Sequence, residues 1–341
     1  MVFYFVIFAL IALSSFSPVT WERKLFVVGG VLLFLIAGLR GSDIDRDYQG
    51  YLEYYRDVLN ANFKNVEPAF ILLTKTIDDV FGDSVMLFVT FAFLGVFIKL
   101  YAIDKLTPYK NLALLFYYVN FFLLHEMTQI RVGVASALLL LCIQPIRQRK
   151  IWQFLLFAGL AICFHYSALM ILPLYFVGAG SRDLLRYAFL LPIAAVLYAL
   201  NVPLIPQFNL MPVELIDLKL SNYAMNDSIE PANIFNGLFV LRCCIAYFFI
   251  WRAPNLVRNS ACFPVLLKIY FISLFFYLAF ARMPGIGSRV SELLNIVEII
   301  LVPTLVLAVG QRLVMHWLVI GLSLAFLIYY LLFAQLIQPY F

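Results

Sequence analysis

The sequence has little charge. Of its 341 residues only 13% are Asp, Glu, Lys or Arg, whereas 64% are hydrophobic. Soluble domains carry about 25% charged residues, so this composition argues against a water-soluble enzyme and indicates a chain surrounded by lipid. The apolar runs are continuous and do not alternate with a period of two, which favours helices over strands.

Cysteine and histidine are scarce. The chain has three histidines and five cysteines, and no pair of them has the spacing of a metal site. The cysteines lie in or beside apolar segments, where free Cys packs as a small hydrophobic residue; they are Cys142, Cys163, Cys243, Cys244 and Cys262. We therefore expect no disulfide framework, no metal and no cofactor. A basic tract with interleaved aromatics is also lacking, which excludes a nucleic-acid partner.

Twelve apolar segments are spaced along the chain. A bilayer core of about 30 Å needs about 20 apolar residues per helix. The predicted spans are 2–17, 24–39, 84–103, 110–124, 129–146, 150–163, 165–178, 184–200, 234–252, 261–281, 291–309 and 313–334. The first has no basic residue before it and no cleavage site after it, so we expect it to be retained. The predicted fold is an all-α, polytopic membrane helix bundle forming one domain over 1–341. Ten or eleven spans remain open if a short pair such as 150–163 and 165–178 is re-entrant.

The basic residues alternate between connections. Cytoplasmic loops of membrane proteins are enriched in Lys and Arg. Every odd-numbered connection is basic: Arg23 and Lys24, then Lys105 and Lys110, Arg147, Arg149 and Lys150, Arg182 and Arg186, Arg252 and Arg258, and finally Arg312. Twelve spans with both termini extracytoplasmic satisfy this pattern, and the net charge of +5 then belongs to the cytoplasmic side.

Two connections are too long for simple turns. Residues 40–83 and 201–233 both face outward in this topology, and loops of this length usually bind a ligand or are disordered. Within the first, Glu67–Phe81 has an amphipathic pattern, with Phe70, Leu73, Ile77, Val80 and Phe81 on its apolar face. We expect a helix there at the outer membrane interface.

Five basic side chains fall at the outer ends of the predicted spans: Arg40, Arg131, His165, Arg282 and Arg289. Charge at membrane depth costs on the order of 3 kcal/mol per residue, so such groups are functional candidates. The alternatives are interfacial anchoring for Arg131 and Arg289, and a hydrogen-bonded core histidine for His165. Because guanidinium groups bind phosphate oxygens in a bidentate manner, this cluster suits a lipid-linked diphosphate.

Arg242 and Glu298 lie deeper, within the ninth and eleventh spans. They are either a buried ion pair that fixes helix register or part of a site near the middle of the membrane.

Three ordered sets of motifs resemble the EpsG/Wzy-type polysaccharide polymerases. They are Gly38-Leu-Arg40-Gly with Asp47-Tyr48, Tyr51, Tyr55 and Glu67-Pro68-Ala-Phe70; Gln129-Ile-Arg131-Val-Gly with Phe164-His165-Tyr-Ser167 and Pro173; and Arg289-Val-Ser with Glu298 and Pro303. The resemblance covers roughly residues 1–310, without residues 181–260.

The resemblance implies a bacterial inner-membrane glycosyltransferase that makes O-antigen, capsule or exopolysaccharide. Its substrates would be undecaprenyl-diphosphate-linked glycans, and its partners membrane lipids, a flippase and a chain-length regulator. Arg131 and Arg289, with Arg40 and Arg282, would hold the donor diphosphate. His165, or one of Asp45, Asp47 and Glu67, would assist the attacking hydroxyl.

Three other functions fit parts of the pattern. A flippase or carrier predicts charge near the midplane and inverted repeats; the charge is present in Arg242 and Glu298, but no repeat is visible. An O-antigen ligase would share the lipid-diphosphate donor and differ only in the acceptor. A purely structural membrane component leaves the buried arginines unexplained.

Overall fold

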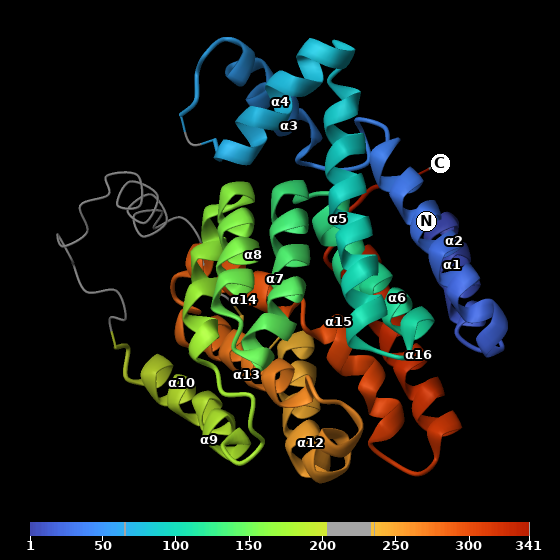
Figure 1. Cartoon of the computed structure of the whole chain (residues 1–341), viewed down its shortest axis with the longest axis vertical. Helices are drawn as coiled ribbons and strands as arrows, with labels where there is room; N and C mark the ends of the chain where they lie inside the picture. The colour runs from blue at the N-terminus through green and yellow to red at the C-terminus, as the bar shows by residue number, and fades with distance from the viewer. Residues whose placement is uncertain (65, 203–232, 235, 341) are drawn as a thin grey trace.

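The structure, a computed structural model, describes residues 1–64, 66–202, 233–234 and 236–340. These residues form helices joined by short connections (Figure 1). The helices are α1 (Val2–Ser14), α2 (Val19–Gly38), α3 (Tyr48–Leu59), α4 (Pro68–Phe81), α5 (Val85–Leu106), α6 (Lys110–Tyr117), η1 (Tyr118–Glu126), α7 (Ile130–Gln148), α8 (Ile151–Phe164), η2 (Tyr166–Phe176), α9 (Leu184–Ala188), α10 (Leu190–Ala199), α12 (Gly237–Asn259), α13 (Phe263–Ala279), α14 (Pro284–Asn295), α15 (Glu298–Leu301), η3 (Val302–Leu307), α16 (Arg312–Ile328) and η4 (Tyr329–Phe333). Within the described residues the only β-type pairing is an isolated bridge between Asp45 and Ile337.

The helical prediction is confirmed, and each of the twelve predicted segments coincides with helix. Among the described residues, five helical stretches are long and apolar enough to cross a membrane: Val85–Leu106, Ile130–Gln148, Gly237–Asn259, Gly285–Leu307 and Arg312–Phe333. The other apolar helices are shorter, so the number of spans stays a prediction.

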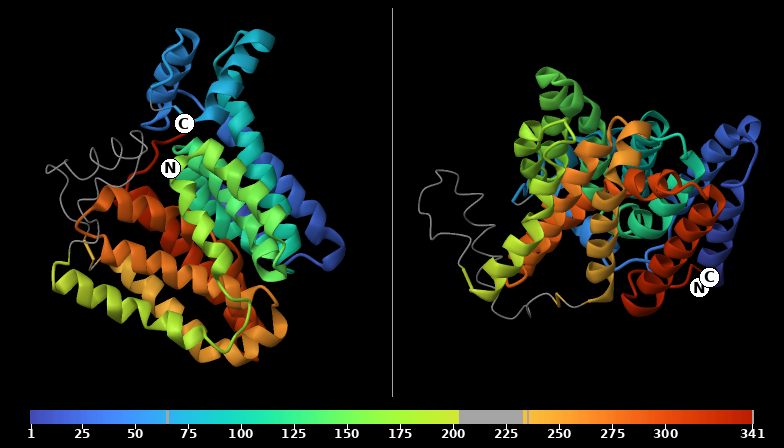
Figure 2. Two further views of the ribbon diagram at one scale, coloured as in Figure 1. Left: turned by 60° about the vertical axis from the view of Figure 1, so that its left-hand side comes forward. Right: turned by 90° about the horizontal axis from the view of Figure 1, so that it is seen from below.

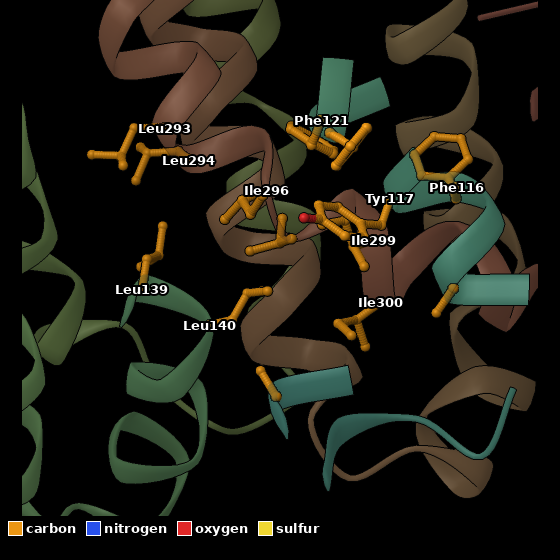
Figure 3. Close-up of a cluster of buried hydrophobic side chains, with 14 of the residues drawn as sticks. Phe116, Tyr117, Phe121, Leu139, Leu140, Leu293, Leu294, Ile296, Ile299 and Ile300 are labelled. Carbon is orange, nitrogen blue, oxygen red and sulfur yellow. The ribbon is translucent and has the colours of Figure 1, made fainter. Parts of the chain in front are cut away.

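The core lies where α6, η1, α7 and the stretch from α14 to η3 meet. Figure 3 shows Leu139 and Leu140 of α7 facing Leu293, Leu294 and the isoleucines that follow, with the rings of Phe116, Tyr117 and Phe121 beside them. Most of these side chains are fully buried. In the most apolar 18-residue window of Gly285–Leu307, 89% of the residues are buried, so this stretch is a central element of the bundle.

The basic connections gather at one end of the protein. Contacts join them in series: Asn111 Nδ2 donates to the carbonyl of Glu22, Gln144 Nε2 to that of Lys105, Arg149 Nη1 to that of Tyr175, and Lys268 Nζ to that of Gly178. Figure 1 shows α9 and α12 reaching the bottom of the view at this end. The basic connections that alternate along the sequence therefore lie together in space.

The opposite end holds α3, α4 and both termini (Figures 1 and 2). The hydroxyl of Tyr4 donates to the carbonyl of Gln338 at 2.9 Å, and the amide of Gln338 donates to the carbonyl of Ile44 at 2.9 Å. Arg46 Nη2 donates to the carbonyl of Gln335 at 2.7 Å. The last residues of the chain thus tie its first helix to the segment that begins at Arg40.

The long segment 40–83 has one helix more than expected. It contains two helices, and α3 was not predicted. In α4, Phe70, Thr74 and Ile77 are buried in the protein, while Val80 and Phe81 are 65% and 61% exposed. The placement of the apolar face at the membrane interface stays a prediction.

One polar contact joins these two helices. The hydroxyl of Tyr55 donates to Asp78 Oδ1 at 2.9 Å. Burial, together with the Asp78 carboxylate, raises the pKa of Tyr55 to about 12, so the hydroxyl stays protonated and keeps donating. The second predicted loop, 201–233, lies almost entirely outside the described residues.

Candidate functional site

A cavity of about 150 Å³ opens at the end that carries α3 and α4. It is formed where the start of α3, the start of α7, the junction between α8 and η2, and α14 come together. Its lining residues are Asp47, Tyr51, Gln129, Arg131, Val132, His165, Arg289 and Glu292. Four of the residues predicted from sequence therefore share one cavity: Asp47, Arg131, His165 and Arg289.

Glu67 lies behind this cavity and links two of its walls. The residue is 1% exposed. One carboxylate oxygen, Oε2, accepts a hydrogen bond from Arg131 Nη1, and the other, Oε1, lies 3.1 Å from His165 Nδ1. Because Pro68 begins α4, Glu67 is the N-cap residue of that helix, so the helix start fixes the carboxylate. Because both of its carboxylate oxygens have partners, Glu67 fixes the positions of Arg131 and His165.

Arg131 is also held by aromatic rings. Its guanidinium carbon lies 5.6 Å from the ring centroid of Tyr51, 4.8 Å from that of Tyr54 and 5.8 Å from that of Phe70. Guanidinium groups are attracted to the faces of such rings. The side chain is 15% exposed, so the planar group is fixed in one orientation and still reaches the cavity.

Asp47 lies at the mouth of the cavity, where it begins α3. Its backbone amide donates to Asp45 Oδ1 at 2.9 Å. Partial burial and the nearby Asp45 carboxylate raise the pKa of Asp47, against the opposing effect of Arg46, Arg131 and Arg289. A carboxylate with a raised pKa binds a proton more readily than an ordinary one.

The α14 wall supplies both signs of charge. Arg289 and Glu292 are three residues apart, so they lie on the same helix face. Gln129 and Glu292 line the same cavity, so this wall faces the start of α7. A Cβ at Gly287 would lie 2.9 Å from the carbonyl oxygen of Phe280, so α14 approaches the end of α13 this closely only with glycine there.

The cavity brings arginines and carboxylates beside an oriented histidine. Within the described part of the chain, no group of three or more His, Cys, Asp or Glu could hold a metal ion. The expectation that no metal is needed stays a prediction.

Comparison with known proteins shows the family of the chain. The family model of the EpsG family matches residues 23–341. The chain belongs to the EpsG family. It is also similar to the amylovoran biosynthesis protein AmsC of Erwinia amylovora, with 24% identity over 342 residues, covering 92% of this chain and 88% of that protein. No solved structure matches the chain.

Two arginines of this EpsG-family chain lie away from the cavity. Arg40 is 4% exposed; its Nε contacts Asp45 Oδ2 at 2.7 Å, its Nη1 donates to the carbonyl of Ala37 at 2.7 Å, and its guanidinium lies 4.7 Å from the Phe88 ring. With these partners Arg40 braces the turn that leads to Asp47. Arg40 therefore pairs with Asp45 and does not line the cavity with Arg131, and its part in binding a diphosphate stays a prediction.

Arg282 lies in a second cavity of about 150 Å³, between α10 and the end of α13. Its guanidinium lies 5.0 Å from the ring of Tyr198. The side chain is exposed. Arg282 and Arg289 line different cavities, because Met283 and the start of α14 lie between them in the chain.

Arg242 and Glu298 face each other at 3.0 Å, between Nε and Oε1. Asn120 completes the cluster: its amide donates to Glu298 Oε2 at 2.6 Å, and its Oδ1 accepts from Arg242 Nη2 and from Tyr330. Three helical elements thus meet at the Glu298 carboxylate, which is 1% exposed, and η4 joins the cluster through Asn120.

Glu292 is the lining residue that sequence reasoning missed most clearly. A signal was available, since it follows Arg289 by three residues and such spacing places both on one helix face. Gln129 and Tyr51 belong to the family motifs, but the sequence assigned them no role in the site. Both residues line the cavity.

Proposed function

We propose that the chain polymerises lipid-linked oligosaccharide repeat units, transferring a growing glycan from one undecaprenyl diphosphate to the terminal sugar of another unit. The observation that carries the proposal is the cavity in which Arg131, Arg289 and an oriented His165 converge with carboxylates. Membership of the EpsG family and the likeness to a protein of amylovoran biosynthesis support polysaccharide synthesis as the setting.

The arginines match the leaving group of such a transfer. When the bond between the anomeric carbon and the phosphate oxygen breaks, negative charge develops on the diphosphate. Preorganised donors in a site sheltered from water stabilise developing charge strongly. Arg131, held by Glu67 and three rings, is preorganised in this sense. Arg289 faces the same cavity and would hold the second phosphate.

His165 has the partner that a general base requires. If Nδ1 carries its proton toward Glu67 Oε1, Nε2 is left as an acceptor, and this is how a carboxylate orients an imidazole base. Nε2 would take the proton of the acceptor hydroxyl as that oxygen bonds to the anomeric carbon and the diphosphate departs. Asp47, at the mouth, is then left to bind sugar hydroxyls.

The topology that fits this reaction has twelve spans, with the cavity and both termini outside the bacterial inner membrane. Its support is spatial: the basic connections gather at one end, and the cavity lies at the other with both termini (Figure 1). Lipid-linked repeat units would reach the cavity from the outer leaflet.

Cysteine labelling tests the orientation. We expect Ser42→Cys to react with a membrane-impermeant maleimide in intact spheroplasts, and Ser181→Cys to react only after permeabilisation, since both residues are exposed at opposite ends. The wild-type chain, with its five cysteines, gives the background. The reverse pattern would place the cavity in the cytoplasm and rule out this topology.

The function is tested by glycan analysis of a strain that lacks the gene. We expect single repeat units on the lipid, with long chains restored by the wild type but not by His165→Ala. His316→Ala is a matched control, because His316 bonds Ser15 at 2.8 Å on another part of the molecule. Long chains in the deleted strain would exclude this chain as the polymerase. Polymer that forms but stays on its lipid would favour a ligase.

A further inference from the structure

A second buried ion pair lies behind the α7 wall of the cavity. Lys99 of α5 contacts Oε1 of Glu126, the last residue of η1, and the two residues are 0% and 2% exposed. Lys99 Nζ also donates to the carbonyl oxygen of Gly133, in the first turn of α7, at 2.7 Å. One ammonium group therefore joins three elements, and α5 runs beside α7 in Figure 1.

The space for this pair is provided by two glycines. A Cβ at Gly95 would lie 2.9 Å from Glu126 Oε1, and a Cβ at Gly133 would lie 3.2 Å from the same atom. Both separations are shorter than ordinary carbon–oxygen contacts. The helices on either side of the Glu126 carboxylate thus leave room for it by having no side chain at the point of contact.

The neighbouring residue adds another link between η1 and α7. His125 is fully buried, and its Nδ1 lies 3.1 Å from the hydroxyl oxygen of Ser136. That hydroxyl also contacts the carbonyl of Gly133, at 2.9 Å. Consecutive residues at the end of η1 are therefore linked to the first two turns of α7, His125 through Ser136 and Glu126 through Lys99.

Only three residues separate Glu126 from the start of α7 at the cavity. Met127, Thr128 and Gln129 join η1 to α7, and the amide of Gln129 donates to the carbonyl of Leu124 at 2.9 Å. Gln129 itself lines the cavity, as do the two residues that follow Ile130 in α7. A shift of the α7 start relative to η1 would move all three lining residues together.

We propose that Lys99 and Glu126 are positioning residues for the cavity, a clamp that holds Gln129, Arg131 and Val132 in place without touching the substrate. Desolvating a buried ion pair is costly, and apolar residues of similar volume often replace such a pair without loss of stability. The pair is therefore a poor means of holding the bundle together, but its hydrogen bonds specify one register of α7 against η1. The inference rests on the proposed function.

The test is the double variant Lys99→Met/Glu126→Leu, purified and placed in liposomes with lipid-linked repeat units. We expect its melting temperature to equal or exceed that of the wild type. We expect kcat to fall by about 100-fold, the scale of a roughly 1 Å misplacement of binding groups, with little change in KM. Hydrogen exchange of residues 127–133 should be faster than in the wild type.

The matched control is Lys268→Met/Asp183→Asn, which removes another buried lysine and its 2.5 Å partner at the opposite end. We expect this control to keep wild-type kcat. Glu126→Gln is the second variant, because its amide oxygen still accepts from Lys99; it should keep more activity than the apolar pair even if either variant melts early.

Each outcome separates the two proposals. A wild-type protein that makes no polymer would overturn the proposed function itself. An active wild type with an equally active apolar double variant would overturn the clamp alone. A Glu126→Gln variant no more active than the apolar pair, at equal folded fraction, would also count against the clamp.

Discussion

Replacing Arg131 with alanine is expected to abolish the long glycan chains. Removing one preorganised donor that stabilises developing negative charge typically lowers kcat by about 10²–10³-fold. Arg131 is such a group, because Glu67 and the rings of Tyr51, Tyr54 and Phe70 fix its orientation at the cavity. Arg131→Lys keeps the charge but loses the planar fork, so we expect chains of intermediate length. The measurement is the glycan ladder at matched protein levels.

Two further variants make this result specific. Arg149→Ala is the matched control, because Arg149 also lies over a tyrosine ring, 5.7 Å from the centroid of Tyr175, but at the basic end; we expect a normal ladder. Arg131→Ala leaves the Glu67 carboxylate with one partner fewer, and the double variant Arg131→Ala/Glu67→Gln removes that charge. Normal ladders in both Arg131→Ala variants would remove Arg131 from the mechanism.

The helices were predictable because continuous apolar runs leave the backbone few alternatives in lipid. The exception is α3. Its buried tyrosines, Tyr48, Tyr51 and Tyr55, recur at helical spacing, but the charged residues between them made the segment resemble a loop. Contacts made by α3 and α5 also decide which residues of α4 are buried in the protein. Neither set of contacts is visible in one amphipathic pattern.

The candidate site was predictable in part, for a similar reason. Arg131, His165 and Arg289 stand out because charge at the end of an apolar run is costly and therefore conspicuous. Glu292 follows Arg289 within a helix of mixed polarity and does not stand out. Arg40 has the same sequence signal as Arg131, yet the structure pairs it with Asp45. Sequence shows which charges need partners, whereas packing determines which partners they find.

The buried pair of Arg242 and Glu298 leads to the largest expected effect on stability. Removing one partner of such a pair leaves an uncompensated charge, which destabilises a protein by about 3–5 kcal/mol. Glu298→Ala would leave the Arg242 guanidinium without its carboxylate partner. Asn120 Oδ1 accepts only one hydrogen bond from this guanidinium. We therefore expect a large fall in melting temperature of the purified protein, and a low folded fraction by size-exclusion chromatography.

Asp104→Ala is the matched control for this prediction. Asp104 pairs with Lys110 at 2.6 Å, but both side chains are about one-quarter exposed, and exposed pairs contribute only about 0–1 kcal/mol. A small change for Asp104→Ala beside a large one for Glu298→Ala would show that burial, and not pairing alone, sets the effect. Equal melting temperatures for Glu298→Ala and the wild type would mean that water reaches Arg242, as it would in a carrier with a hydrated path near the midplane. The same measurement therefore bears on function, because a polymerase whose chemistry is confined to its outer end has no need of such a path.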